Sequence, residues 1–189
     1  MGKRNFYSLI ILLSFQSTIL FSQDKEAEVL KLLNSVRTDP KGFIKAYLTP
    51  YLEENKLESN SYVKSLLADL KNTKKMGALQ ISPELTRVAR QHAKDMGKTG
   101  QIGHTSSDGT SFDQRVRKKA KAGGLIAENC DYGNWEAIDS VIGLLIDDGI
   151  KSLGHRKNIL EPKFKWVGIA IEPHKTYGVN CVMDFAESL

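Results

Sequence analysis

The spacing of apolar residues changes character once along this chain, from a helical to a strand-like pattern. Residues 24–38, 83–98 and 135–146 place apolar side chains three or four positions apart, as amphipathic helices do. Residues 166–171 and 177–185 are instead rich in β-branched and aromatic residues, which predicts two antiparallel strands. Helices first and a hairpin last, without strand–helix alternation, predict one layered α+β domain and argue against a doubly wound sheet.

The clearest helix start lies at Ser82. Serine is a preferred N-cap, Pro83 suits the first helical position, and Glu84 is favourable in the first turn. The helix that follows is expected to end near residue 98. A polar loop over 103–109 and a short helix to about residue 120 come next.

The N-terminal segment differs from the rest of the chain. Lys3 and Arg4 precede an uncharged, largely apolar stretch that ends at Ser22, which is the layout of a secretory signal peptide. An uncleaved membrane anchor is the alternative, although serine, threonine and glutamine dilute the stretch. We therefore predict a signal peptide over 1–22, a single domain over 23–189, and a secreted or periplasmic protein with no stable membrane span after cleavage.

The charge of the chain gives little support for a nucleic-acid partner. Its formal net charge is +5, and Lys3 and Arg4 contribute part of it. A basic run exists, but no aromatic residues are interleaved in it to form a stacking platform. We interpret this run as the solvated face of a helix and predict no nucleic-acid binding; its members are Arg115, Arg117, Lys118, Lys119 and Lys121.

The chain has two cysteines, Cys130 and Cys181. In an oxidising compartment they can pair, and we expect a disulfide between them. Two separate buried thiols are the alternative, because a sequence does not give the distance between their Cα atoms.

The four histidines divide into two kinds of position. His104 lies in GHTSSDG and His155 in GHRKNIL, two loop-like segments of the sort that present ligands and catalytic groups. His92 lies on an apolar helical stripe and is expected to be a hydrogen-bonded core residue. His174 lies in the turn between the two strands and is expected to be solvated.

Carboxylates accompany these histidines. Glu128 follows an apolar run over 125–127, so we expect it to be at least partly buried and to need a partner. Asp147 and Asp148 end the helix before His155, where a carboxylate can raise the histidine pKa or supply a metal-binding oxygen.

Together these segments resemble the CAP superfamily of cysteine-rich secretory proteins, antigen-5 allergens and plant pathogenesis-related proteins, especially its bacterial members. The resemblance covers about residues 32–185 and rests on RQHAKDM, GHTSSDG, AENC, GHRKNIL and VGIA in that order. It implies an α-β-α sandwich with a small, mainly antiparallel sheet and a cleft with two histidines and two acidic residues. Ala127 replaces a usual glycine, and most disulfides of eukaryotic members are missing.

Matched residue by residue, the resemblance places this cleft on His104, Glu128 and His155, with Asp147 as the fourth member and Asp148 as its alternative. In some relatives such a set binds zinc or another divalent ion, so these four are both the candidate metal ligands and the candidate catalytic residues.

The same cleft is compatible with two kinds of function. A monomeric binding module would hold a divalent metal or an extracellular peptide, glycan or lipid. A peptidase-like, metal-assisted hydrolase would use Glu128 as general base. Nucleophilic catalysis by Ser106 or Cys130 lacks a nucleophile elbow, and a Glu128–Asp147 glycosidase pair would leave the histidines unexplained. The sequence alone does not decide between enzyme and binding module.

Overall fold

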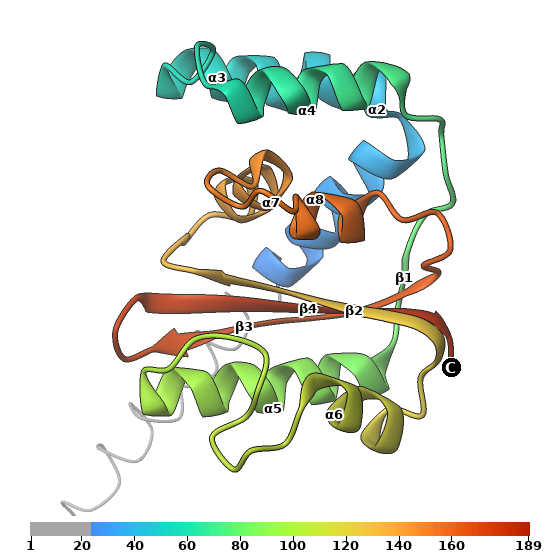
Figure 1. Cartoon of the computed structure of the whole chain (residues 1–189), viewed down its shortest axis with the longest axis vertical. Helices are drawn as coiled ribbons and strands as arrows, with labels where there is room; N and C mark the ends of the chain where they lie inside the picture. Colours follow the sequence, from blue (N-terminus) through green and yellow to red (C-terminus); the bar gives the residue numbers. More distant parts are fainter. Residues whose placement is uncertain (1–23) are drawn as a thin grey trace, which may run out of the picture.

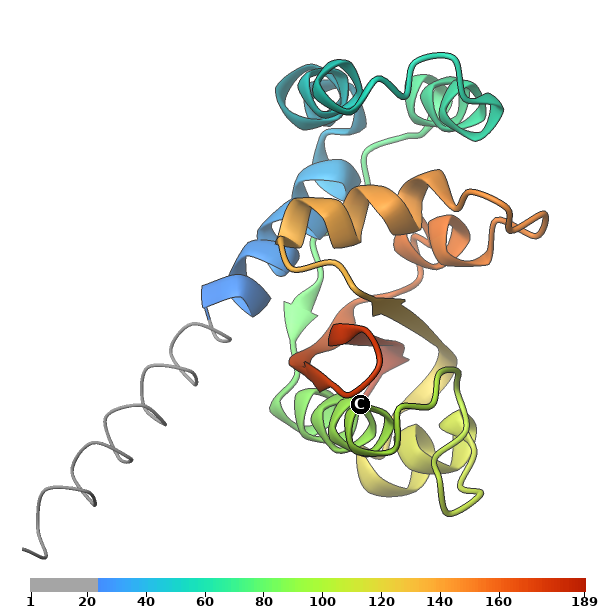
Figure 2. The same cartoon turned by 90° about the vertical axis from the view of Figure 1, so that its left-hand side faces the viewer.

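The computed structural model describes residues 24–189, so the predicted signal peptide lies outside the described residues. Over that range no helix has the length and apolar character needed to cross a membrane. A four-stranded sheet lies between layers of helices, and the expected α-β-α sandwich is confirmed (Figures 1 and 2).

The sheet has the strand order β1-β3-β4-β2. Strands β3 (Trp166–His174) and β4 (Gly178–Ser188) form the predicted antiparallel hairpin. Strand β2 (Gly123–Tyr132) pairs antiparallel with β4, and the short β1 (Gln80–Ile81) pairs parallel with β3. The sheet is therefore mainly antiparallel, and β2 is one of its edge strands. Neither β1 nor β2 had been expected from the sequence.

Two helices cover one face of the sheet. Helix α5 (Pro83–Thr99) begins where the sequence predicted, with the Ser82 hydroxyl accepting a hydrogen bond from an amide of the first turn. Helix α6 (Phe112–Lys119) begins with a capping box formed by Ser111 and Gln114. Alanines of α5 pack closely on the sheet, in a cluster of small residues formed by Ala89, Ala93, Cys130, Ala170 and Val182.

The opposite face carries the larger apolar core. A helix over residues 24–38, α7 (Ala137–Ile146) and α8 (Gly154–Ile159) pack there. A further layer covers these helices (Figure 1). It consists of α2 (Pro40–Phe43), the π-helix η1 (Ile44–Leu48), α3 (Thr49–Asn55) and α4 (Ser61–Asn72).

Two local predictions need correction. Helix α7 begins at Ala137, so Trp135 precedes it and is 58% exposed instead of belonging to its apolar side. His155 lies in the first turn of α8, where we had expected a loop.

The predicted disulfide was wrong. Cys130 pairs with Val182 across β2 and β4, whereas Cys181 pairs with Asp131. Residues opposite each other share a face of the sheet and successive residues alternate, so the two thiols point to opposite faces. Cys130 packs under α5, Cys181 belongs to the core under α7, and both are free and buried.

Candidate functional site

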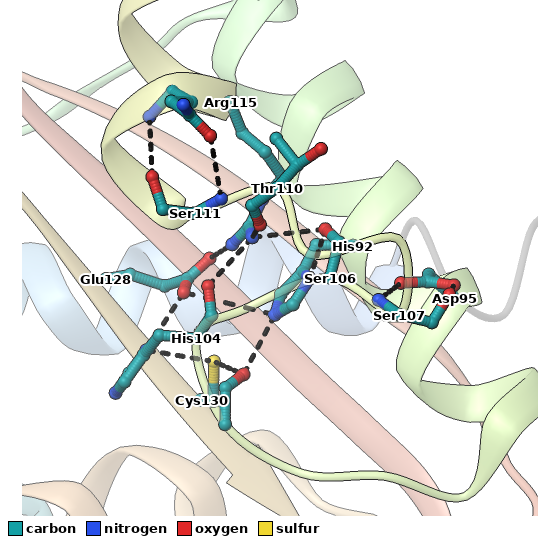
Figure 3. A network of polar contacts seen from close by, with 12 residues as sticks. His92, Asp95, His104, Ser106, Ser107, Thr110, Ser111, Arg115, Glu128 and Cys130 are labelled. Carbon is teal, nitrogen blue, oxygen red and sulfur yellow. Dashed lines mark hydrogen bonds and ion pairs between the residues drawn. The ribbon is translucent and has the colours of Figure 1, made fainter.

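The first histidine–carboxylate pair lies under the loop that follows α5 (Figure 3). His104 Nδ1 donates a hydrogen bond of 2.9 Å to Oε1 of Glu128. Glu128 comes from β2 and is buried, and Arg115 of α6 donates to its other oxygen at 2.6 Å. The imidazole of His104 is 54% exposed, and its second ring nitrogen points away from the network in Figure 3. The buried carboxylate thus fixes one nitrogen of the ring and leaves the other one free.

Arg115 was assigned to a solvated face, and this was wrong. Its side chain is only 3% exposed, and it also donates to the backbone carbonyl of His104 (2.8 Å) and to the Ser106 hydroxyl (3.2 Å). The helical period could have revealed this role, because Arg115 lies on the same face of α6 as the apolar residues Phe112 and Val116. Arg115 therefore holds the loop of His104 onto Glu128.

His92 forms the floor of this network, as its predicted core position suggested. Its Nε2 donates to the Gly103 carbonyl at 2.9 Å, and its Nδ1 lies 3.4 Å from the Ser106 hydroxyl. Burial lowers its pKa. His92, Glu128 and Cys130 each place one potential ligand atom within 4.8 Å of the others, so this group could hold a metal ion.

The second pair lies at the opposite face of the sheet, between α7 and α8. His155 Nδ1 donates to Oδ1 of Asp147 at 2.7 Å, and Oδ2 accepts from the backbone amides of His155 (2.9 Å) and Arg156 (3.4 Å). Asp147 caps α7 in the left-handed conformation and is 3% exposed. Asp148 instead accepts a hydrogen bond from Asn60. Of the two alternatives, Asp147 is thus the one that contacts His155.

The residues next to His155 support its position. The buried guanidinium of Arg156 donates to the last carbonyls of α7, Leu145 (2.7 Å) and Ile146 (2.8 Å), and pairs with Asp69 of α4. Asn129, on β2, donates to the His155 carbonyl at 3.1 Å. The backbone around His155 is thereby tied to the sheet and to the outer helices.

The surroundings of the first pair shift the pKa values of its two members. Burial acts to raise the pKa of Glu128, but the hydrogen bond from His104 and the charge of Arg115 outweigh it, so the pKa is lowered. The same hydrogen bond raises the pKa of His104. Asp184, opposite Glu128 on β4, has its pKa raised by burial and then by the Glu128 charge. Glu128 is therefore the ionised member of a buried carboxyl pair.

The second pair lines a pocket, and the first pair lies behind one of the pocket's lining residues, Cys130. An open pocket of about 440 Å³ is lined by Asp147, Asp148 and His155 on one side and by Cys130 on the other. The Cys130 sulfur lies 3.8 Å from Nδ1 of His104. No hydrogen bond or ion pair between described residues joins the two pairs directly. The structure thus gives two separate histidine–carboxylate pairs next to the same end of β2.

An aromatic cluster lies at this end of the sheet. His174, expected in solvent, is 3% exposed and donates from Nε2 to the Gln101 carbonyl at 2.9 Å. Its ring contacts Tyr132 and Tyr177, with centroids 5.4 and 5.2 Å away. Both tyrosines line the pocket, and Tyr177 is 45% exposed. This cluster could not be expected from the sequence, because it depends on the pairing of β2 with β4.

Solved structures with the same fold come from bacterial surface proteins. An outer surface protein of Borrelia burgdorferi is 20% identical, with a TM-score of 0.51 over 70% of this chain and 97% of that one. An extracellular SCP-domain protein of Bacillus anthracis is 18% identical, with a TM-score of 0.50 over 67% of this chain. The matched part is only 39% of the Bacillus protein. At these identities the likeness concerns the fold.

Family membership rests on the sequence match. No curated protein matches the chain. The model of the CAP, or cysteine-rich secretory protein, family matches residues 30–185, which include both histidine pairs, strands β1 to β3 and most of β4. The chain therefore belongs to the CAP family.

Proposed function

We propose that this chain is a secreted CAP-domain binding protein whose pocket holds a divalent metal ion such as Zn²⁺ through His104 and His155. One observation carries the proposal: both imidazoles donate from Nδ1 to a buried carboxylate and keep Nε2 unused. Metal-binding histidines in proteins characteristically have this arrangement, because the carboxylate fixes the tautomer and makes the other nitrogen a better ligand.

The proposal changes the roles of the two acidic residues. Glu128 and Asp147 already bind a histidine and, through their second oxygens, Arg115 or backbone amides. They serve as orienting partners, and the two Nε2 atoms serve as ligands. Water or a bound molecule would complete the coordination, and a divalent ion there would supply Lewis acidity.

The buried group of His92, Glu128 and Cys130 fits a metal less well. His92 Nε2 donates to the Gly103 carbonyl, so it carries a proton and offers no lone pair. Burial, followed by the charges of Glu128 and Asp184, raises the pKa of the Cys130 thiol, which disfavours the thiolate that a metal needs.

Binding is favoured over metal-assisted hydrolysis. A general base needs a free oxygen within hydrogen-bond reach of the attacking water. Both oxygens of Glu128 are engaged, and its side chain is only 1% exposed. Glu128 therefore has no free oxygen with which to act as the general base of a peptidase-like reaction.

The extracellular location is supported by two observations of different kinds. The segment 1–22 has the layout of a signal peptide. Two structural relatives are named as extracellular or outer surface proteins.

Zinc titration by calorimetry tests the metal site. We would use residues 24–189, which contain every element described here, and the variants His104→Ala and His155→Ala. Asp148→Asn is the matched control, because it lines the same pocket without contacting either histidine. We expect one zinc per chain in the parent and the control, and loss of binding in both histidine variants. Equal zinc binding by all four proteins would refute the site.

A further inference from the structure

The free edge of β2 forms the floor of the pocket. Cys130, Asp131 and Tyr132 are consecutive in β2, and all three line it. Successive strand residues point to opposite faces, so a pocket lined by all three must lie across the edge of the strand. Ile102 reaches it from the α5 side and Leu144 from the α7 side.

The backbone of β2 offers unused hydrogen-bonding groups at this edge. The Gly133 amide donates to the Val179 carbonyl of β4 at 3.0 Å. By the alternation of an antiparallel ladder, the polar groups of Asp131 also face β4, while those of Cys130 and Tyr132 face outward. Among the described residues, the Cys130 amide and the outward carbonyls of Cys130 and Tyr132 have no hydrogen-bond partner. The β2–β4 register is unbroken from Ile126 to Tyr132.

The two walls of the pocket differ in chemistry. The α7 wall carries the carboxylates of Asp131, Asp147 and Asp148, and no lysine or arginine lines the pocket. The α5 wall is apolar and aromatic, with the exposed side chain of Ile102 (58%) next to Tyr132. One side of the strand edge thus suits a cation, and the other suits an apolar group.

We propose that the edge of β2 binds an extended peptide as an added strand, with basic side chains directed to the exposed carboxylate of Asp148 and apolar side chains directed to Ile102 and Tyr132. Main-chain hydrogen bonds at an exposed strand edge give affinity in such complexes, and pockets for alternate side chains give specificity. An added strand presents alternate side chains to the two walls. The ligand class is therefore a segment in which basic and apolar residues alternate.

This inference goes beyond the metal site and does not require a metal. Its test is run with a chelator present, so that failure of zinc binding and failure of peptide binding are separate results. The probe is a fluorescent, N-acetylated pentapeptide, Val-Lys-Val-Lys-Val. Its control is Val-Val-Val-Lys-Lys, which has the same composition without the alternation. A second control carries N-methyl groups on alternate backbone nitrogens and cannot donate to the strand edge.

Fluorescence anisotropy should show the alternating peptide binding about tenfold more tightly than either control. The scrambled peptide loses the alternation that matches charges to the two walls, and the N-methylated peptide loses the hydrogen bonds to the strand edge. Asp148→Asn should weaken binding of the alternating peptide about threefold, as expected for one exposed charge. Glu84→Gln, which removes an exposed carboxylate from the first turn of α5, at the opposite end of that helix from Ile102, should leave binding unchanged.

Amide hydrogen exchange locates the peptide. In the free protein the outward Cys130 amide should exchange faster than the Asp131 amide, which faces β4. Saturation with the alternating peptide should slow exchange at Cys130. Equal affinity for the three peptides, or tight binding that leaves Cys130 exchange unchanged, would overturn the proposal.

Discussion

Glu128 and Asp184 face each other across β2 and β4, beneath α5 and α6, and their pKa values are shifted in opposite directions. Glu128 stays ionised because His104 and Arg115 donate to it, which lowers its pKa. Asp184 is fully buried, and burial followed by the Glu128 charge raises its pKa well above the usual range. The pair thus shares a single negative charge, which Arg115 neutralises.

Replacing each of these carboxyl groups by an amide should have opposite consequences. Glu128→Gln leaves Arg115 buried without its counter-charge and should cost about 3 to 5 kcal/mol of unfolding free energy. Asp184→Asn replaces a neutral donor by another neutral donor and should cost little. Urea unfolding at neutral pH measures both. Similar losses in the two variants would contradict the assigned protonation states.

The pH dependence of the Asp184→Asn variant gives a second test of the same pair. A carboxyl group with a raised folded-state pKa supports folding fully below its unfolded pKa of about 3.9, and this support is lost as pH rises toward the folded value. The amide does not titrate. The difference in Tm between the variant and the parent should therefore shift in favour of the variant as pH rises, in thermal unfolding followed by circular dichroism. A difference that is independent of pH would show that Asp184 is ionised.

The metal site should be sensitive to protons through His104. The hydrogen bond to Glu128 raises the pKa of His104, so below that value both ring nitrogens carry a proton. Zinc must then displace the Nε2 proton, which weakens binding about tenfold per pH unit below the pKa. Calorimetric titrations at several pH values should show affinity rising with pH. A flat profile would exclude His104 as a ligand.

The two cysteines should remain thiols in the folded protein. Burial raises the pKa of both, and they lie on opposite faces of the sheet. Mass spectrometry after alkylation should show two modified cysteines in the denatured protein without prior reduction, and slow modification in the native state. Modification that requires reduction would demonstrate the disulfide that the structure contradicts.

The contact between α5 and β3 should tolerate no side chain at Gly168. A Cβ atom there would lie 2.2 Å from the Leu85 carbonyl carbon and 2.3 Å from the Thr86 nitrogen, both backbone atoms of α5. We expect Gly168→Ala to lower the unfolding free energy by about 3 kcal/mol, as overpacking does. Gly77→Ala, where nothing lies within 4 Å of the added carbon, is the control and should have little effect.

The features that could be predicted from the sequence depend on short segments of the chain. The start of α5 was predictable because Ser82, Pro83 and Glu84 each act within one turn. Both histidine pairs were found because His104, Glu128 and His155 lie in segments that resemble a known family. Asp147 and His155 are also separated only by a short loop, so their contact could be expected.

The missed features depend on register between distant segments. Strand β2 carries Glu128, Asn129 and Asp131, residues that are depleted in strands, and its partner β4 lies far away in the sequence. Without β2, neither the opposite faces of the two cysteines nor the free edge could be derived. Arg115 is likewise buried because it pairs with Glu128. The basic residues around Arg115 in the sequence concealed this role.

The nitrogen chemistry of the two imidazoles tests the central claim most directly. Long-range ¹H–¹⁵N spectra of residues 24–189 distinguish Nδ1 from Nε2 in each ring and can be followed as zinc is added. At a pH above the His104 pKa, both rings should begin with the proton on Nδ1, and zinc should shift the Nε2 resonances of His104 and His155 alone. Shifts confined to His92, or rings that begin protonated on Nε2, would contradict the account.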